Sequence, residues 1–308
     1  MIRILIIGSL VLLLPMSGIA VAFSFPGHTM NLTERLGWRM AGFHAHTVEV
    51  MGHEIRYVSG GSGAPLILLH GFGGTSANWS GVASELSEHF QLIIPDLPGY
   101  GRSSRLNDES YVVAEQIARL HAFTEALGLD RFYLGGNSMG GHIAAGYAAE
   151  NEERVQGLWL IAPAGVTGGI APEFMQHLED GRNPLLVDSL EAFDDMLEYT
   201  FVDPPAIPRF FRRQLAKDAI DSRPFLESTS LAMLADPYPL EPKIEGLKTP
   251  ALITWGNQDR VLDPRSAQTF ADLLSNAEVQ FIEDAGHLPM MEKPDVAGRA
   301  LLEFFGKR

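Results

Sequence analysis

The sequence predicts an α/β fold in which a mostly parallel central sheet carries helices on both faces. Short apolar stretches of strand length alternate with longer segments of helical periodicity over most of the chain after about residue 47. The alternation breaks once, between Val166 and Glu245, where several helical patterns are punctuated by prolines and no convincing strand occurs. The third observation is a glycine-rich turn, Gly136–Gly140, between an apolar strand-like run and an alanine-rich helical one. Together these features predict one parallel sheet with a helical insertion.

The composition describes a folded chain and excludes several classes of partner. With 308 residues, 46% of them hydrophobic, the chain is long enough to bury a sizeable core. A net charge of -15 without any basic run of the nucleic-acid-binding kind argues against a nucleic-acid partner. Cysteine is absent, and no two histidines have H-x-x-x-H or H-E-x-x-H spacing. We therefore expect neither a bound metal nor a cofactor.

The N-terminus contains a segment of membrane-spanning length. Ile4 to Phe25 is 22 residues without a charge, which as a helix would extend about 33 Å, enough for the hydrocarbon core of a bilayer. The alternative is a cleaved signal peptide, because Ala20–Ala22 fits the small-residue cleavage rule and Arg3 supplies a minimal positive region. The length of the run favours a retained anchor.

A helical pattern follows this apolar run. Leu32, Leu36, Met40 and Phe43 recur at helical spacing, and Trp38 is a residue type suited to a membrane interface. We expect a juxtamembrane amphipathic helix, with an ordinary helix packed on the domain as the alternative. The expected division of the chain is therefore an anchor and juxtamembrane helix over 1–43 and a folded domain over 44–308, with its helical insertion at about 166–245.

The remaining elements follow from periodicity and turn residues. In chain order we expect β-stretches at 47–50 and 55–58, a strand at 65–69, a helix at 79–90, a strand at 92–95, a helix at 111–127, a strand at 131–135, a helix at 142–150, a strand at 157–161, the insertion, a strand at 251–255, a helix at 266–274, a strand at 279–282 and a helix at 296–305. Within the insertion, Arg209–Arg213 is the most basic stretch. It is interpreted either as a lipid-facing surface or, more commonly for such a pattern, as a solvated helix with buried phenylalanines.

The Gly136–Gly140 turn has the G-x-S-x-G pattern that exposes a serine between a strand and a helix. In that position the hydroxyl of Ser138 can attack a carbonyl carbon, while the backbone N–H of Met139 faces the oxyanion that forms. A glycine-rich loop, His70–Gly74, ends an earlier strand, and the N–H of Phe72 is the natural second oxyanion donor. The alternative is a strand-to-helix turn with an idle serine.

A serine nucleophile needs a histidine base, and the histidine needs a carboxylate. Asp259 follows the strand that ends at Trp255, and His287 follows the last strand, so both belong to loops at the sheet edge that carries Ser138. Asp263 and Asp284 are the rival acids, and Asp259 is favoured because it is closer to the strand end.

Two further histidines are expected to have structural roles. His142 lies one helical turn after Ser138, where a packing or surface role is expected. His70 precedes the glycine loop and is expected to orient that loop rather than to take a proton.

These motifs resemble the successive landmarks of the α/β-hydrolase family over nearly the whole chain after about His44. The matching segments are His70–Gly73, Asp96–Gly101, Gly136–Gly141, Trp255–Asp259 and Gly286–His287. The resemblance is strongest to the membrane-anchored lipase branch, which includes monoacylglycerol lipases and the PlaF-like bacterial phospholipase A. Members of this branch also have segments that match residues 162–165, 259–263 and 286–294, and they have a similar N-terminal anchor.

That resemblance implies a serine hydrolase acting on acylglycerols or phospholipids, with the insertion as a cap over the acyl site. The expected partners are a lipid or fatty-acyl ester substrate and the bilayer, with the catalytic domain on the non-cytosolic (periplasmic) side of a single-pass anchor. The sequence leaves the oligomeric state open, a homodimer through the N-terminal helix being one arrangement.

Two other functions remain open at this stage. One is a carbon–carbon bond hydrolase of ring-cleavage products, although such enzymes usually carry a Gly-Pro-Gly loop where this chain has Gly73–Thr75. The other is a non-catalytic binding protein of the same fold, against which the intact Ser138, Asp259 and His287 argue.

Overall fold

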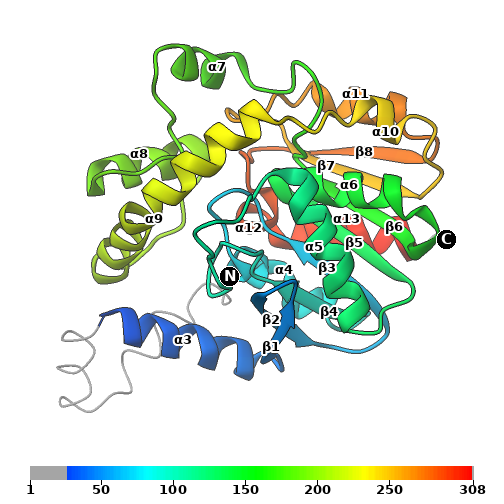
Figure 1. Ribbon diagram of the computed structural model, residues 1–308, viewed down its shortest axis with the longest axis horizontal. Coiled ribbons are helices and arrows are strands. Elements are labelled where there is room, and N and C mark those ends of the chain that lie inside the picture. Colours follow the sequence, from blue (N-terminus) through cyan, green and yellow to red (C-terminus); the bar gives the residue numbers. More distant parts are fainter. Residues whose placement is uncertain (1–25, 307–308) are drawn as a thin grey trace.

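A computed structural model describes residues 26–306. Its centre is an eight-stranded sheet with the order β1-β2-β4-β3-β5-β6-β7-β8 (Figure 1). β1 and β2 pair antiparallel with each other, β2 pairs antiparallel with β4, and all pairs from β4 to β8 are parallel. The strands are β1 (His44–Val50), β2 (His53–Gly60), β3 (Ala64–Leu69), β4 (Phe90–Pro95), β5 (Phe132–Asn137), β6 (Val155–Ile161), β7 (Ala251–Gly256) and β8 (Ala277–Ile282). The predicted mostly parallel α/β sheet is confirmed.

The helices cover both faces of this sheet because its central strands bury side chains on both sides. Along β3, Ile67 and Leu69 belong to one core and Leu66 and Leu68 to the other, as the two-residue period of a strand requires. The first core is completed by α5 (Val113–Ala126), α6 (Met139–Glu150) and α11 (Ser266–Leu273), and the second by α4 (Ser80–Leu86), α12 (Pro289–Glu292) and α13 (Pro294–Gly306).

One predicted helix is shorter than expected. Instead of a helix over 79–90, the chain forms a 3₁₀ turn, η2 (Ser76–Trp79), and then α4, which ends at Leu86. Thr75 caps the 3₁₀ turn in a reciprocal capping box with Asn78. Phe90 is not helical because it pairs with Ala64 in the β3–β4 ladder and buries its ring beside Tyr133. Sheet pairing therefore overrides the apolar periodicity at this boundary.

The predicted insertion is helical. It consists of α7 (Pro172–Glu179), α8 (Leu190–Thr200), α9 (Arg209–Ala235) and α10 (Glu241–Ile244), and between 166 and 245 the structure has no strand, only an isolated bridge from Ile170 to Leu262. The cap has a small core of its own around Phe193, Leu197 and Phe201. Prolines do not always separate its helices, since Pro224 lies inside α9. Figure 1 shows α8 and α9 standing away from the sheet as a separate layer.

The expected helix after the apolar run is present as α3 (Pro26–Met40). Trp38, a residue type suited to a membrane interface, is instead buried against the protein. It is only 7% exposed and packs on Phe43, with ring centroids 5.0 Å apart. Phe43 itself follows the helix and is buried, whereas Leu32 and Met40 remain 58% and 70% exposed. The helix therefore packs on the domain and still presents an apolar edge to its surroundings.

The expected membrane segment, Ile4 to Phe25, lies outside the described residues. Within 26–306, no helix is both long enough and apolar enough to cross a membrane.

Candidate active site

Ser138 is held in a strained backbone conformation directly after β5. Its φ of 55° and ψ of -118° are outside the regions that side-chain-bearing residues prefer. The flanking glycines are required by space, since a Cβ on Gly136 would lie 2.2 Å from the carbonyl oxygen of Gly140 and one on Gly140 would lie 2.3 Å from that of Leu69. Ser138 precedes α6 and is half-buried. The local sequence therefore builds the sharp strand-to-helix turn that the motif predicts.

His287 and Asp259 meet in the loops after β8 and β7. The Nδ1 of His287 lies 2.8 Å from Oδ2 of Asp259, and both residues are buried. The same carboxylate oxygen accepts a hydrogen bond from Nε1 of Trp255 at 3.0 Å. Its other oxygen accepts the N–H groups of Val261 and Leu262 at 2.8 and 3.0 Å. The carboxylate is thus fixed by three donors besides the imidazole, and the imidazole is fixed in turn.

The rival acids have other partners. Asp263 binds the guanidinium of Arg265, which holds the pKa of the carboxyl below its usual range. Asp284 accepts a hydrogen bond from the side chain of Gln258 at 3.2 Å. Only Asp259 among the three predicted acids contacts His287 within the described residues.

Ser138 belongs to the same edge of the sheet as this pair. The side chain of Asn137, the residue before Ser138, donates to the carbonyl of His287 at 3.1 Å and to that of Ile161 at 3.2 Å. The N–H of Ser138 donates to Ile161 as well, at 3.0 Å. In residues 26–306 the hydroxyl of Ser138 makes no hydrogen bond, so proton transfer from Ser138 to His287 stays a prediction, as catalytic contacts often tighten only with substrate.

The glycine loop lies against the serine. A Cβ on Gly71 would be 3.1 Å from Cβ of Ser138, so the backbone before Phe72 approaches Ser138 closely. Met139 opens α6 and is buried, with its sulfur 3.5 Å from the hydroxyl of Tyr100. The N–H groups of Phe72 and Met139 stay the predicted oxyanion donors.

His70 orients the loop in the manner expected. Its Nε2 accepts the N–H of Leu97 at 2.9 Å, so Nδ1 carries the proton and donates to the carbonyl of Gly71 at 2.8 Å. Burial lowers the pKa of this imidazole, which keeps it neutral. His70 therefore ties the glycine loop to the turn after β4.

His142 has a structural contact with the cap. Its Nε2 donates to the carbonyl of Tyr238 at 2.5 Å, and burial lowers the pKa of the ring. This contact joins α6 to the segment between α9 and α10, which is a packing role of the kind expected.

The sequence did not predict one feature of the site, an aromatic contact between the cap and the domain. We call the residues that hold Phe225 of the cap, namely Tyr100, Tyr111 and Arg105, the seat. The ring of Phe225 on α9 packs on Tyr100 and Tyr111, with centroids 5.6 and 4.9 Å away, and the guanidinium of Arg105 lies 3.9 Å from its centroid. A Cβ on Gly99 would lie 2.6 Å from this ring. No periodicity predicts such contacts, because Phe225 is far from the others in sequence.

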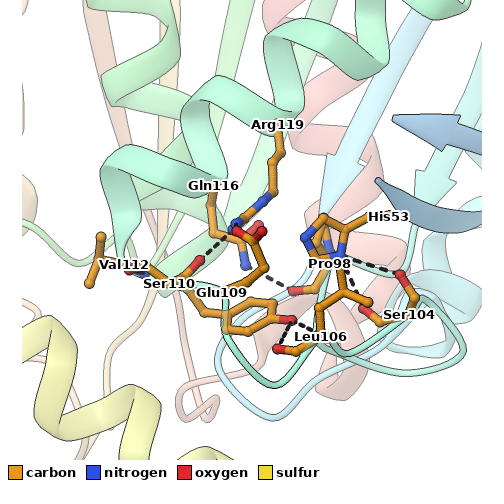
Figure 2. Close-up of polar contacts among 10 residues, drawn as sticks. His53, Pro98, Ser104, Leu106, Glu109, Ser110, Val112, Gln116 and Arg119 are labelled. Carbon is orange, nitrogen blue, oxygen red and sulfur yellow. Dashed lines mark hydrogen bonds and ion pairs between the residues drawn. The ribbon is translucent and has the colours of Figure 1, made fainter. Parts of the chain in front are cut away.

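The segment that contains Tyr111 is also held by a polar network that includes Arg119, Glu109 and Ser110 (Figure 2). The buried guanidinium of Arg119 donates to the carbonyl of Ser110 at 2.6 Å and to Glu109 at 3.0 Å. The hydroxyl of Tyr111 bonds both the N–H and the carbonyl of Leu106, at 2.7 and 3.1 Å. The 106–111 segment is therefore fixed where it meets the cap.

A cavity of about 280 Å³ lies elsewhere, between α3 and the β2 side of the sheet. Its lining includes Arg35, Arg56 and Arg102 together with Glu34 and Asp96, and none of the predicted catalytic residues. We do not assign it to the acyl chain. In the part of the chain that the structure describes, no group of three His, Cys, Asp or Glu side chains could hold a metal ion.

The eight-stranded, mostly parallel sheet carries Ser138, Asp259 and His287 in the loops that follow β5, β7 and β8 at its carboxyl edge. Residues 64–294 match the family model described as alpha/beta hydrolase fold, and the chain belongs to this family.

Comparison with individual proteins gives lipases and a phospholipase. Lipase 3 of Moraxella sp. (strain TA144) is 34% identical over 233 residues, which are 75% of this chain and 74% of the relative. A monoacylglycerol lipase of Mus musculus is 30% identical over 78% of this chain and 74% of its own length. The crystal structure of a membrane phospholipase A, described as a bacterial virulence factor, superposes with a TM-score of 0.90 at 37% identity, covering 98% of this chain and 97% of that one.

Proposed function

We propose that this α/β-hydrolase cleaves fatty-acyl esters of glycerolipids, as a lipase or phospholipase A, with Ser138, His287 and Asp259 as its catalytic triad. The observation that carries the proposal is the buried Asp259–His287 pair beside a serine held on a strained turn. The lipase and phospholipase relatives support a carboxylic ester as the substrate class.

The reaction follows from these groups. The hydroxyl oxygen of Ser138 attacks the ester carbonyl carbon while Nε2 of His287 takes the hydroxyl proton. Negative charge on the former carbonyl oxygen is stabilised by the N–H groups of Phe72 and Met139. His287 then passes its proton to the departing alkoxide, which leaves an acyl group on Ser138. Water attacks this acyl-enzyme with His287 as base, which releases the fatty acid and restores the hydroxyl.

Asp259 acts on the histidine rather than on the substrate. Its contact to Nδ1 keeps the proton there in the resting state, so that Nε2 is free to accept one. It also stabilises the imidazolium that forms during the attack.

The 166–245 cap is proposed to select the acyl chain. Leu226 on α9 is buried beside the glycine loop, where a Cβ on Gly73 would lie 3.8 Å from its Cδ1. The middle of α9 therefore lies over the oxyanion loop, where the substrate must enter.

Membrane attachment forms part of the proposal. The apolar Ile4–Phe25 run, the exposed Leu32 and Met40 on α3 and the likeness to a membrane phospholipase A support a single-pass anchor over 1–43. We place the 44–308 domain on the non-cytosolic (periplasmic) side of the cell membrane, where it meets lipid substrate.

A substrate panel tests the proposal. The detergent-solubilised full-length protein is offered monoacylglycerols, lysophospholipids, diacyl phospholipids and a ring-cleavage dienoate, and fatty-acid release is measured. Release from one or more of the lipids is expected. Turnover of the dienoate alone would favour a carbon–carbon bond hydrolase, and no turnover together with no fluorophosphonate labelling would favour a binding protein.

A further inference from the structure

The carboxylate of Glu292 joins two segments that are far apart in the chain. Glu292 ends α12, shortly after His287. Its Oε1 accepts the N–H of Gly286, the residue before His287, at 2.7 Å. Its Oε2 accepts the N–H groups of Val202 and Asp203, at 2.8 and 3.2 Å, and these belong to the cap segment after α8. One side chain therefore binds the histidine loop and the cap at the same time.

The cap also contacts the histidine loop directly. The N–H of His287 donates to the carbonyl of Thr200, the last residue of α8, at 2.8 Å. A Cβ on Gly286 would lie 2.6 Å from that carbonyl oxygen and 3.3 Å from Cα of Phe201, so the two backbones touch. The position of His287 thus depends on where the end of α8 lies.

We propose that Glu292 is a positioning residue that couples the cap to His287, so that the imidazole is set for catalysis only while the 200–203 segment is seated. This inference rests on the proposed function. When Glu292 releases Val202 and Asp203, the Thr200 carbonyl can move, and His287 loses the partner of its N–H.

The chemistry of the contact requires an ionised carboxylate. Three N–H donors converge on two oxygens, and a carboxylate is an acceptor at both, whereas an amide or a protonated acid presents a donor at one of them. Burial raises the pKa of Glu292, while the three N–H groups and Lys293 lower it. Charged side chains on the neighbouring segments include Asp203 after α8, Glu85 on α4 and Asp295 on α13. As pH falls through this raised pKa, Glu292 takes up a proton and the contact is lost.

The test compares Glu292→Gln with Glu303→Gln in the full-length protein. Glu303 is an exposed carboxylate on α13 and serves as the matched control. Three quantities are measured: kcat and KM for a short-chain p-nitrophenyl ester, the rate of fluorophosphonate labelling, and the melting temperature. We expect Glu292→Gln to lower kcat and the labelling rate together by roughly 10- to 100-fold with KM little changed, because a misplaced base slows chemistry rather than binding.

The pH profile supplies a readout that a merely structural role would not move. In the wild-type protein, the acid limb of the labelling rate from about pH 4 to about pH 9 should reflect two protonations, one of them at Glu292, with a limiting slope of about two. In Glu292→Gln the acid limb of the labelling rate should reflect only one protonation. If Glu292→Gln does not fold, the slope of the acid limb in the wild-type protein tests the inference on its own.

Wild-type kcat and labelling rate in Glu292→Gln, or a wild-type acid limb with a slope of about one, would overturn the inference. A wild-type protein that neither hydrolyses esters nor reacts with the fluorophosphonate would instead overturn the proposed function, so the two failures are distinguishable.

Discussion

Ser138, His287 and Asp259 belong to three separate loops. Their common edge of the sheet is predicted from one observation, namely that each follows a strand of one parallel sheet. The structure brings Asp259 and His287 into contact. The N–H groups of Val261 and Leu262 bind the other carboxylate oxygen of Asp259, and its role as the catalytic acid stays a prediction. The partners of Asp263 and Asp284 could not have been predicted, since they depend on side-chain directions in the loops.

At the residue scale, Asp259→Asn should lower kcat by about 10⁴, by analogy with the best-studied triad, because the amide favours the wrong imidazole tautomer. Ester hydrolysis by the purified variant measures this. Asp263→Asn is the control and should leave kcat nearly unchanged, since Asp263 binds Arg265 instead. A larger loss in Asp263→Asn than in Asp259→Asn would show that the wrong acid has been assigned.

At the element scale, the strands were predictable and the helix ends were less so. Apolar runs such as β3 and β7 are buried on both faces, and burial of that kind leaves a continuous hydrophobic signal. The end of α4 was misplaced because Phe90 fits a helical pattern equally well, and only its pairing with Ala64 decides. Prolines punctuate the helical patterns of the 166–245 segment in the sequence, yet α9 continues through Pro224. No local sequence pattern predicts the contact of α9 with Tyr100 and Tyr111.

That seat leads to a prediction about the cap. Phe225→Ala removes the ring that Tyr100, Tyr111 and Arg105 hold, so the middle of α9 loses its fixed place above the glycine loop. We expect the preference between short and long acyl chains to change while fluorophosphonate labelling of Ser138 is retained. Leu231→Ala, on the same helix but 62% exposed, is the control and should alter neither. Unchanged chain-length preference in Phe225→Ala would contradict the role given to the seat.

Replacing the whole 166–245 segment by the cap of a short-chain esterase extends the same test. The triad loops after β5, β7 and β8 lie outside the segment. The chimera should hydrolyse shorter esters in preference to longer ones and still react with the fluorophosphonate. If its chain-length profile matched that of the parent, the cap would not be the selecting element.

At the scale of the whole molecule, the family and the fold were predictable because the family's motifs follow one another in order along the chain. How α3 lies relative to a membrane was harder to predict from the sequence. Periodicity predicted a juxtamembrane amphipathic helix, with a helix packed on the domain as the alternative. In the structure Trp38 turns inward onto Phe43, and the ion pair between Glu34 and Arg102 at 2.5 Å ties α3 to the turn after β4. An amphipathic pattern alone cannot distinguish a face buried on protein from one buried in lipid.

The anchor is tested on membranes from cells that make the full-length protein. Alkaline carbonate extraction should leave the protein in the membrane fraction, because a 22-residue apolar run is longer than the apolar h-region of most signal peptides. N-terminal sequencing should find the original terminus. Release into the soluble fraction with a new terminus at Phe23 would show a cleaved signal peptide and reduce the proposal to a secreted esterase.

The central claim, that Ser138 is the nucleophile of an ester hydrolase activated by His287, is tested most directly by the intact mass of the purified full-length protein after incubation with a long-chain fluorophosphonate. One adduct is expected, located on Ser138 by peptide mapping, with loss of lipid hydrolysis in proportion to the modified fraction. Ser138→Ala and His287→Ala should form no adduct and lose several orders of magnitude in kcat, because the members of a triad act as a unit. An adduct on another residue, or near-wild-type turnover in either purified variant, would contradict the account.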